Sequence, residues 1–457
     1  MAGRSRPPRH SVAGWPSDRP AATREPARGL MRRDYAVTLA GQVSQAVASL
    51  IAVVVLARLL PPAQFGVAVL LTMAVTIAGI AVAAGAQAAV LVTSARRPAA
   101  RPEIAGVNLA LTAVVLAVAI PVALVASQPF ATALSREANG SMVFVTAIRI
   151  VPTVYIGLVT ASLTGAGRIG MAALLGLAGA AFSTLMPLGA WIAADRLLGA
   201  LIGALVGNVA TMAIGALLSR RGLGFASPRH ATLWRELWSI GAPLHLGTVA
   251  YWLLLRADAF ILNAIVGGAE VGIYALALTL TERVSLVTSP LYNATAWRIS
   301  GPDPAAALRT CLLIVQVMIA VGVAACVGAI VVGPFVVDLL AGPAYAAAAG
   351  LMPILVVGAA LLPVWSALGL FLVSHQDGVW LTTVVQITVA VAAIAGYLVG
   401  IRAAGMIGAA VVSTLAYASL AVIALAAVRS RHAFSLARLI PTPASVRTML
   451  APADPRD

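Results

Sequence analysis

The feature that most constrains this 457-residue chain is a series of twelve apolar runs, each long enough to cross a membrane. A membrane-spanning helix needs about 20 mostly apolar residues. Only 10% of the residues are charged and 61% are hydrophobic, whereas a soluble domain carries roughly 25% charged residues. The chain has too little polar surface for a water-exposed fold. We therefore predict an all-α integral membrane protein with about twelve transmembrane helices.

The twelve runs divide into two sets of six. The first six are predicted at 36–57, 66–91, 104–127, 142–164, 170–193 and 198–219. The second six are predicted at 238–265, 271–292, 309–333, 348–374, 380–401 and 407–428.

The distribution of arginine orients these spans. All 30 basic residues are Arg, and the formal net charge is +15. If the N-terminus is cytoplasmic, 23 of the arginines fall in cytoplasmic segments and four in outer loops. This agrees with the excess of positive charge that cytoplasmic loops carry. We therefore predict that both termini are cytoplasmic, and we attribute most of the net charge to topology rather than to nucleic-acid binding.

Several kinds of chemistry are disfavoured by the residues that the chain lacks. Without Lys there is no phosphate-binding Walker A loop, and the two cysteines, Cys311 and Cys326, lie in one apolar segment, which fits neither a disulfide framework nor a zinc site. The longest predicted outer loop, 128–141, offers only Arg136 and Glu137 as ionisable groups. We therefore expect no enzymatic activity, no metal and no bound cofactor, and we expect the chain to act inside the helix bundle.

A sequence repeat relates the two halves. The segment 60–68 (LPPAQFGVA) follows the first span, and the similar segment 266–274 (VGGAEVGIY) follows the seventh, 206 residues later. Both join an odd-numbered span to the next one. Two six-helix bundles of the same orientation, related by an axis along the membrane normal and enclosing a central cavity, follow from such a repeat.

Other segments resemble those of a known family. The turn 57–66 (ARLLPPAQFG) is similar to the element after the first helix of polysaccharide and O-antigen flippases, and Asp258 lies within the seventh span. Further matches are 165–168 (GAGR), 241–244 (GAPL), 271–275 (VGIYA) and 340–345 (LAGPAY). Their order and spacing over residues 36–430 resemble the flippases of the multidrug, oligosaccharidyl-lipid and polysaccharide exporter superfamily.

The resemblance implies a flippase that moves a polyprenyl-pyrophosphate-linked oligosaccharide from the inner to the outer leaflet of a bacterial cell membrane by alternating access. Its partners would be this lipid-linked substrate, membrane lipids and proteins of polysaccharide assembly. The expected organisation is a disordered Arg- and Pro-rich cytoplasmic tail at 1–34, a first bundle at 35–221, a cytoplasmic linker at 222–237, a second bundle at 238–428 and a basic tail at 429–457.

Three arginines lie inside predicted spans, namely Arg149, Arg256 and Arg283. A charge at the centre of a membrane helix costs at least ~2.5 to 3.5 kcal/mol and normally faces a partner or a wet cavity. A guanidinium offers paired donors to phosphate oxygens, so all three are candidates to bind the pyrophosphate group. Counted along its predicted span, Arg256 lies toward the outer mouth. The alternatives are that Arg256 extends to the outer interface and that Arg283 pairs with an acid to join two helices.

Polar and acidic residues complete the candidate site. Gln45 on the first span is a candidate to bind sugar hydroxyls, although such amides also join helices. Asp258 and Glu282 are candidates to carry H⁺ or Na⁺ for energy coupling, and equally to act as counter-ions of the arginines.

Three alternatives compete with the flippase hypothesis. A multidrug or organic-cation antiporter of the same superfamily would favour buried acids, whereas three arginines face two acids in these spans. A membrane glycan polymerase or ligase is disfavoured by the short outer loops. A scaffold without transport does not explain why charges are kept inside the membrane.

Overall fold

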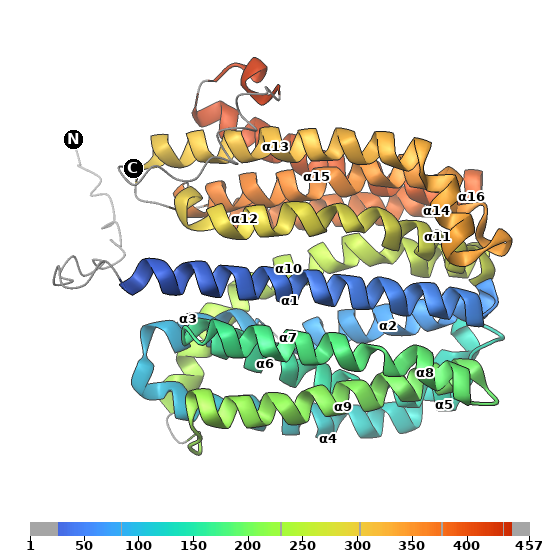
Figure 1. Cartoon of the computed structure of the whole chain (residues 1–457), viewed down its shortest axis with the longest axis horizontal. Coiled ribbons are helices and arrows are strands. Elements are labelled where there is room, and N and C mark those ends of the chain that lie inside the picture. Colours follow the sequence, from blue (N-terminus) through green and yellow to red (C-terminus); the bar gives the residue numbers. More distant parts are fainter. Residues whose placement is uncertain are drawn as a thin grey trace, which may run out of the picture.

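The computed structural model describes residues 26–83, 85–228, 231–300, 303–375, 378–432 and 434–440. These residues form helices and 3-10 turns, and no strand occurs among them. The helices of the two halves of the chain lie in two adjacent groups, with long axes roughly parallel (Figure 1). Of the predicted tails, residues 1–25 and 441–457 lie outside the described part, and α1 begins at Pro26, within the segment predicted as disordered.

The first half contributes nine α-helices and one 3-10 turn among the described residues. They are α1 (Pro26–Leu59), α2 (Pro62–Ala83), α3 (Ala86–Arg96), η1 (Pro98–Ala100), α4 (Arg101–Leu134), α5 (Gly140–Ile148), α6 (Ile150–Gly165), α7 (Ile169–Ser183), α8 (Leu185–Ile192) and α9 (Arg196–Leu223).

The second half contributes the remaining described elements. They are α10 (Ala231–Ile265), α11 (Gly268–Thr281), η2 (Glu282–Val284), α12 (Ser285–Ile299), α13 (Pro304–Val331), α14 (Gly333–Ala341), η3 (Pro343–Tyr345), α15 (Ala348–His375), α16 (Val379–Arg431) and η4 (Leu436–Leu439).

The predicted number of spans agrees with this structure. Ten segments of the described chain are long and apolar enough to cross a membrane. One of them, the 53-residue α16, has non-helical backbone at Ala404 and Gly405 and is therefore two helices joined by a sharp turn. The apolar part of α1, Val43–Leu59, adds a further, shorter segment. The chain is a multi-pass membrane protein.

Several spans are broken in their interior. Pro152 has no N–H to donate to the carbonyl of Ile148, and the helix is interrupted at Arg149, between α5 and α6. The helix predicted at 271–292 is likewise divided by the 3-10 turn η2, which contains Glu282. Breaks of this kind inside a helix often mark functional positions, and both of these contain an ionisable residue.

The two halves meet at one end of the bundle, where α2 and α11 begin. A Cβ atom built on Gly66 would lie 2.9 Å from the backbone nitrogen of Gly272, and one built on Gly272 would lie 3.2 Å from that of Gly66. These two glycines occupy equivalent positions in the sequence repeat, so the helices cross where the two repeats meet. We call this contact the glycine crossing, and the end of the bundle that contains it the crossing end.

Other contacts between the halves close the crossing end. The Tyr345 hydroxyl donates to the carbonyl of Leu60 at 3.3 Å, and its ring meets that of Phe65 edge to face, with centroids 5.8 Å apart. Arg58 Nε donates to the carbonyl of Leu340 at 2.8 Å. At the opposite, terminal end, where α1 begins and α16 ends, an ion pair of 3.0 Å joins Arg97 to Glu236 on α10.

Large apolar side chains cover the outside of the bundle. Examples are Val125, Trp191 and Val331, which are 79%, 70% and 72% exposed. In water such a surface would aggregate, whereas in a bilayer lipid chains cover it. The exterior of the structure therefore fits the membrane environment expected from composition.

Candidate functional site

A cavity of about 400 Å³ lies between the two halves, and we call it the central cavity. Its walls come from α1, α2, α7, α8 and α9 of the first half and from α10, α11 and η2 of the second. Its charged lining residues are Arg149, Arg256 and Glu282. Small polar side chains add hydrogen-bonding groups, namely Ser49, Thr72, Thr76, Ser183, Asn208 and Thr279.

Arg149 contributes a cation that has no counter-ion among the described residues. It is only 6% exposed, at the break between α5 and α6, and it lines the central cavity. Its Nε and Nη1 atoms are buried and have no hydrogen-bond partner in the described part of the chain. A buried charge with unsatisfied donors is strongly unfavourable. An anion bound in the cavity would pair with Arg149 and lower this free-energy cost.

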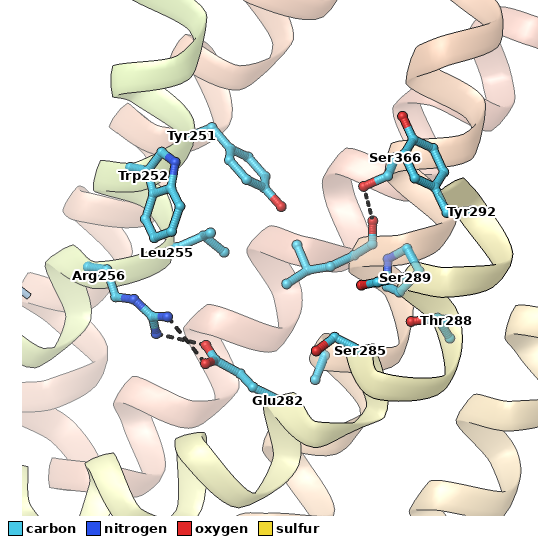
Figure 2. Close-up of a pocket in the computed structure, with 13 residues that line it drawn as sticks. Tyr251, Trp252, Leu255, Arg256, Glu282, Ser285, Thr288, Ser289, Tyr292 and Ser366 are labelled. Carbon is cyan, nitrogen blue, oxygen red and sulfur yellow. Dashed lines mark hydrogen bonds and ion pairs between the residues drawn. The ribbon is translucent and has the colours of Figure 1, made fainter. Parts of the chain in front are cut away.

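Arg256 is neutralised within the cavity wall. Its Nη1 and Nη2 atoms donate to the two carboxylate oxygens of Glu282, at 2.7 and 3.2 Å, a bidentate pair between α10 and η2 (Figure 2). The predicted span placed Arg256 toward the outer mouth. In the structure α10 runs from Ala231 to Ile265, so the helix begins seven residues before the predicted span and ends at the same residue. The depth of Arg256 in the membrane stays a prediction.

Arg283 makes a contact between the two halves. Its Nη1 atom donates to the hydroxyl of Ser49 on α1 at 2.9 Å. Ser49 itself lines the central cavity. Arg283 thus reaches the rim of the same space from the 3-10 turn η2, next to Glu282.

Asp258 is held by hydrogen bonds rather than by an ion pair among the described residues. It is fully buried, and its carboxylate accepts hydrogen bonds from the backbone N–H of Ala259 at 2.8 Å, from the Tyr274 hydroxyl at 2.6 Å and from the Ser413 hydroxyl at 3.1 Å. Tyr397 also lies 3.1 Å from the Ser413 oxygen. Asp258 therefore belongs to a polar network inside the second half, between α10, α11 and α16, and does not line the central cavity.

Gln45 is exposed on α1 and does not line the central cavity.

Trp252, which the sequence analysis did not identify as a candidate, lines this cavity together with Arg256. The spacing of four residues on α10 puts both side chains on one helix face. This spacing could have indicated Trp252 from the sequence once Arg256 was identified as a candidate.

More than half of the chain matches a known family. Residues 31–297 match the model of a family described as polysaccharide biosynthesis protein. No curated protein matches the chain.

Solved structures share the fold. A multidrug resistance MATE family transporter of the MOP superfamily, in its inward-facing conformation, is 15% identical with a TM-score of 0.71, covering 87% of this chain and 98% of that one. An outward-facing MATE family transporter gives a TM-score of 0.65 at 15% identity, over 87% and 94% of the two chains. A MOP superfamily transporter from Pyrococcus furiosus, described as having a binding pocket of reverse polarity, gives 0.64 at 15% identity over the same shares. The fold is that of a membrane transporter.

Proposed function

The chain belongs to the polysaccharide biosynthesis protein family, and we propose that it is a lipid-linked oligosaccharide flippase rather than an enzyme. It moves a polyprenyl-pyrophosphate-linked oligosaccharide from the inner to the outer leaflet of a bacterial cell membrane by alternating access. The two halves act as two bundles, and the central cavity between them receives the polar head of the substrate while the polyprenyl chain stays in lipid.

The observation that carries this proposal is the unpaired guanidinium of Arg149. Of the two cavity-lining arginines, Arg256 is held by Glu282, whereas Arg149 has buried donors with no partner among the described residues. A pyrophosphate supplies several acceptor oxygens and negative charge, and charge-assisted hydrogen bonds of this kind are the strong ones. Arg283, at the rim, is placed to contribute after its bond to Ser49 opens.

The closed crossing end indicates the side of the membrane from which the substrate enters the central cavity. We take the terminal end as cytoplasmic, because the arginine distribution favours cytoplasmic termini. The glycine crossing then closes the outer side, and substrate enters from the inner side.

Coupling to H⁺ or Na⁺ would use Asp258 in preference to Glu282. Both oxygens of Glu282 are engaged by Arg256. Asp258 faces neutral hydroxyls instead, so a proton or sodium ion could compensate its charge.

The proposal is tested by binding to the purified protein in detergent. The ligands are a polyprenyl pyrophosphate and the corresponding polyprenol. We expect the wild-type protein to prefer the pyrophosphate and Arg149→Gln to lose about 10- to 100-fold in affinity for it, since hydrogen bonds to charged groups contribute about 1.5–3 kcal/mol. Arg168→Gln, which changes an exposed arginine of the same half, is the matched control. Equal affinity for both lipids, or unchanged binding in Arg149→Gln, would refute the proposal.

Export of organic cations is the second candidate function, and it is favoured by the fold shared with a multidrug transporter. It requires Glu282 to leave Arg256 and face the ligand. Binding of tetraphenylphosphonium that disappears in Glu282→Gln, together with no binding of polyprenyl pyrophosphate, would support it over the flippase.

A further inference from the structure

A second cavity, of about 330 Å³, opens within the second half of the chain between α10, α12 and α15. We call it the side cavity. Its volume falls in the range of roughly 300–1,000 Å³ that is usual for small-molecule sites. It shares Trp252, Arg256 and Glu282 with the central cavity, so the Arg256–Glu282 ion pair lies at the boundary between the two spaces.

The walls of the side cavity combine aromatic rings with hydroxyl groups. Tyr251 and Trp252 extend from α10 on one side, and Tyr292, Ser285 and Ser289 extend from α12 on the other (Figure 2). The hydroxyls of Ser366 and Thr288 donate to the carbonyls of Leu362 and Val284, four residues earlier in the chain, at 3.1 and 3.3 Å.

Four of these hydroxyls have no partner in the described part of the chain. Tyr251, Tyr292, Ser285 and Ser289 make no side-chain hydrogen bond to any residue that the structure describes. Ser285 and Ser289 are exposed, whereas Tyr251 and Tyr292 are partly buried. Polar groups inside a membrane protein normally find a partner. The two tyrosine hydroxyls, with the serine hydroxyls beside them, are therefore available to a ligand that carries hydroxyl groups of its own.

A saccharide fits this lining better than an anion does. Its ring hydroxyls both donate and accept hydrogen bonds, as Ser and Tyr hydroxyls do. Its C–H face carries slight positive charge and packs on the negative face of an aromatic ring. Among the described residues that line the side cavity, the charged ones are Arg256 and Glu282, which neutralise each other. Arg149, the cation without a described partner, lines the central cavity instead.

We propose that the side cavity binds the first sugar residues of the lipid-linked substrate while the central cavity holds its pyrophosphate. This inference rests on the proposed flippase function and divides the polar head of the substrate between the two cavities. The pyrophosphate meets Arg149, while the polyprenyl chain stays in lipid. The saccharide passes the ion pair and packs between the aromatic rings of α10 and α12.

The test compares two ligand types in one binding assay with purified full-length protein. One is bare polyprenyl pyrophosphate, and the other is the same lipid carrying glucose, galactose or N-acetylglucosamine. The variants are Tyr251→Ala, Tyr292→Ala and the cavity-filling Ser289→Phe, none of which alters a lining residue of the central cavity. Tyr251→Phe and Tyr292→Phe keep the ring and remove only the hydroxyl.

We expect the wild-type protein to bind at least one glycosylated lipid about tenfold more tightly than the bare lipid. The two Tyr→Ala variants and Ser289→Phe should lose that difference and keep the wild-type affinity for the bare lipid, and the Tyr→Phe variants should retain part of the difference. Unchanged affinity for the bare lipid also shows that each variant is folded.

Three results separate the failure of this inference from failure of the proposed function. If bare lipid binds through Arg149 but no side-cavity variant changes the preference for any glycosylated lipid, the division of the substrate is wrong and the flippase proposal stands. Equal loss for bare and glycosylated lipids in these variants likewise overturns the division. If the wild-type protein binds neither kind of lipid, both proposals fall.

Discussion

Replacement of Gly272 by Ala should shift the protein away from the state in which the crossing end is closed. The new Cβ would lie 2.9 Å from the carbonyl carbon of Pro62 and closer still to its oxygen, whereas ordinary contact begins at 3.4 Å. The two backbones must therefore separate by at least 0.5 Å, the difference between those distances. Both contacting groups are backbone, so no side chain can rotate to make room.

The energetic magnitude follows from overpacking. Adding a methyl group to a well-packed site costs about 1–3 kcal/mol. If the cost falls only on the closed state, the ratio of open to closed molecules rises roughly 5- to 150-fold. Gly66→Ala, at the equivalent repeat position, should act in the same direction because its Cβ would lie 2.9 Å from the nitrogen of Gly272.

The assay is a distance measurement between spin labels at Glu137 and Ala347. Both residues are exposed, on loops of opposite halves at the crossing end, and the labels are introduced after Cys311 and Cys326 are replaced by Ser. We expect a longer-distance population to grow in Gly272→Ala. Gly350→Ala is the matched control, since a Cβ there meets nothing within 4 Å. A distance distribution in Gly272→Ala that matches this control would contradict the reasoning.

The remaining predictions concern stability, measured as the thermal unfolding midpoint in detergent. Asp258→Asn should lower the midpoint, because an amide has one acceptor oxygen and its NH2 group cannot accept, so the hydrogen bonds from Tyr274, Ser413 and the N–H of Ala259 cannot all be kept. A buried unsatisfied group costs about 1–3 kcal/mol; an unchanged midpoint would argue against the network. Gly85→Ala should also destabilise, because Gly85 has φ +73° and a Cβ there would lie 2.6 Å from the carbonyl carbon of Gly241. Gly170→Ala, which meets nothing within 4 Å, is its control and should leave the midpoint unchanged.

The extent to which the site could be predicted differs from residue to residue. The in-span positions of Arg149, Arg256 and Glu282 marked them as candidates, and all three line the central cavity. The spacing of these residues in the sequence could not show which of them form an ion pair, because Arg256 and Glu282 are 26 residues apart on different elements. The aromatic lining of the side cavity was missed for a similar reason, since Tyr251 on α10 and Tyr292 on α12 line one cavity only in the folded bundle.

The sequence by itself determined the membrane environment, the helical class and the twofold repeat. These follow from local properties: apolar runs of spanning length must satisfy their backbone hydrogen bonds internally, and repeated segments fold alike. Only the tertiary structure decided the charge partners, the glycine crossing and the division of the interior into two cavities. Helices that are apolar on nearly every face carry little information about their rotation, so the packing of neighbouring helices decides which polar groups meet.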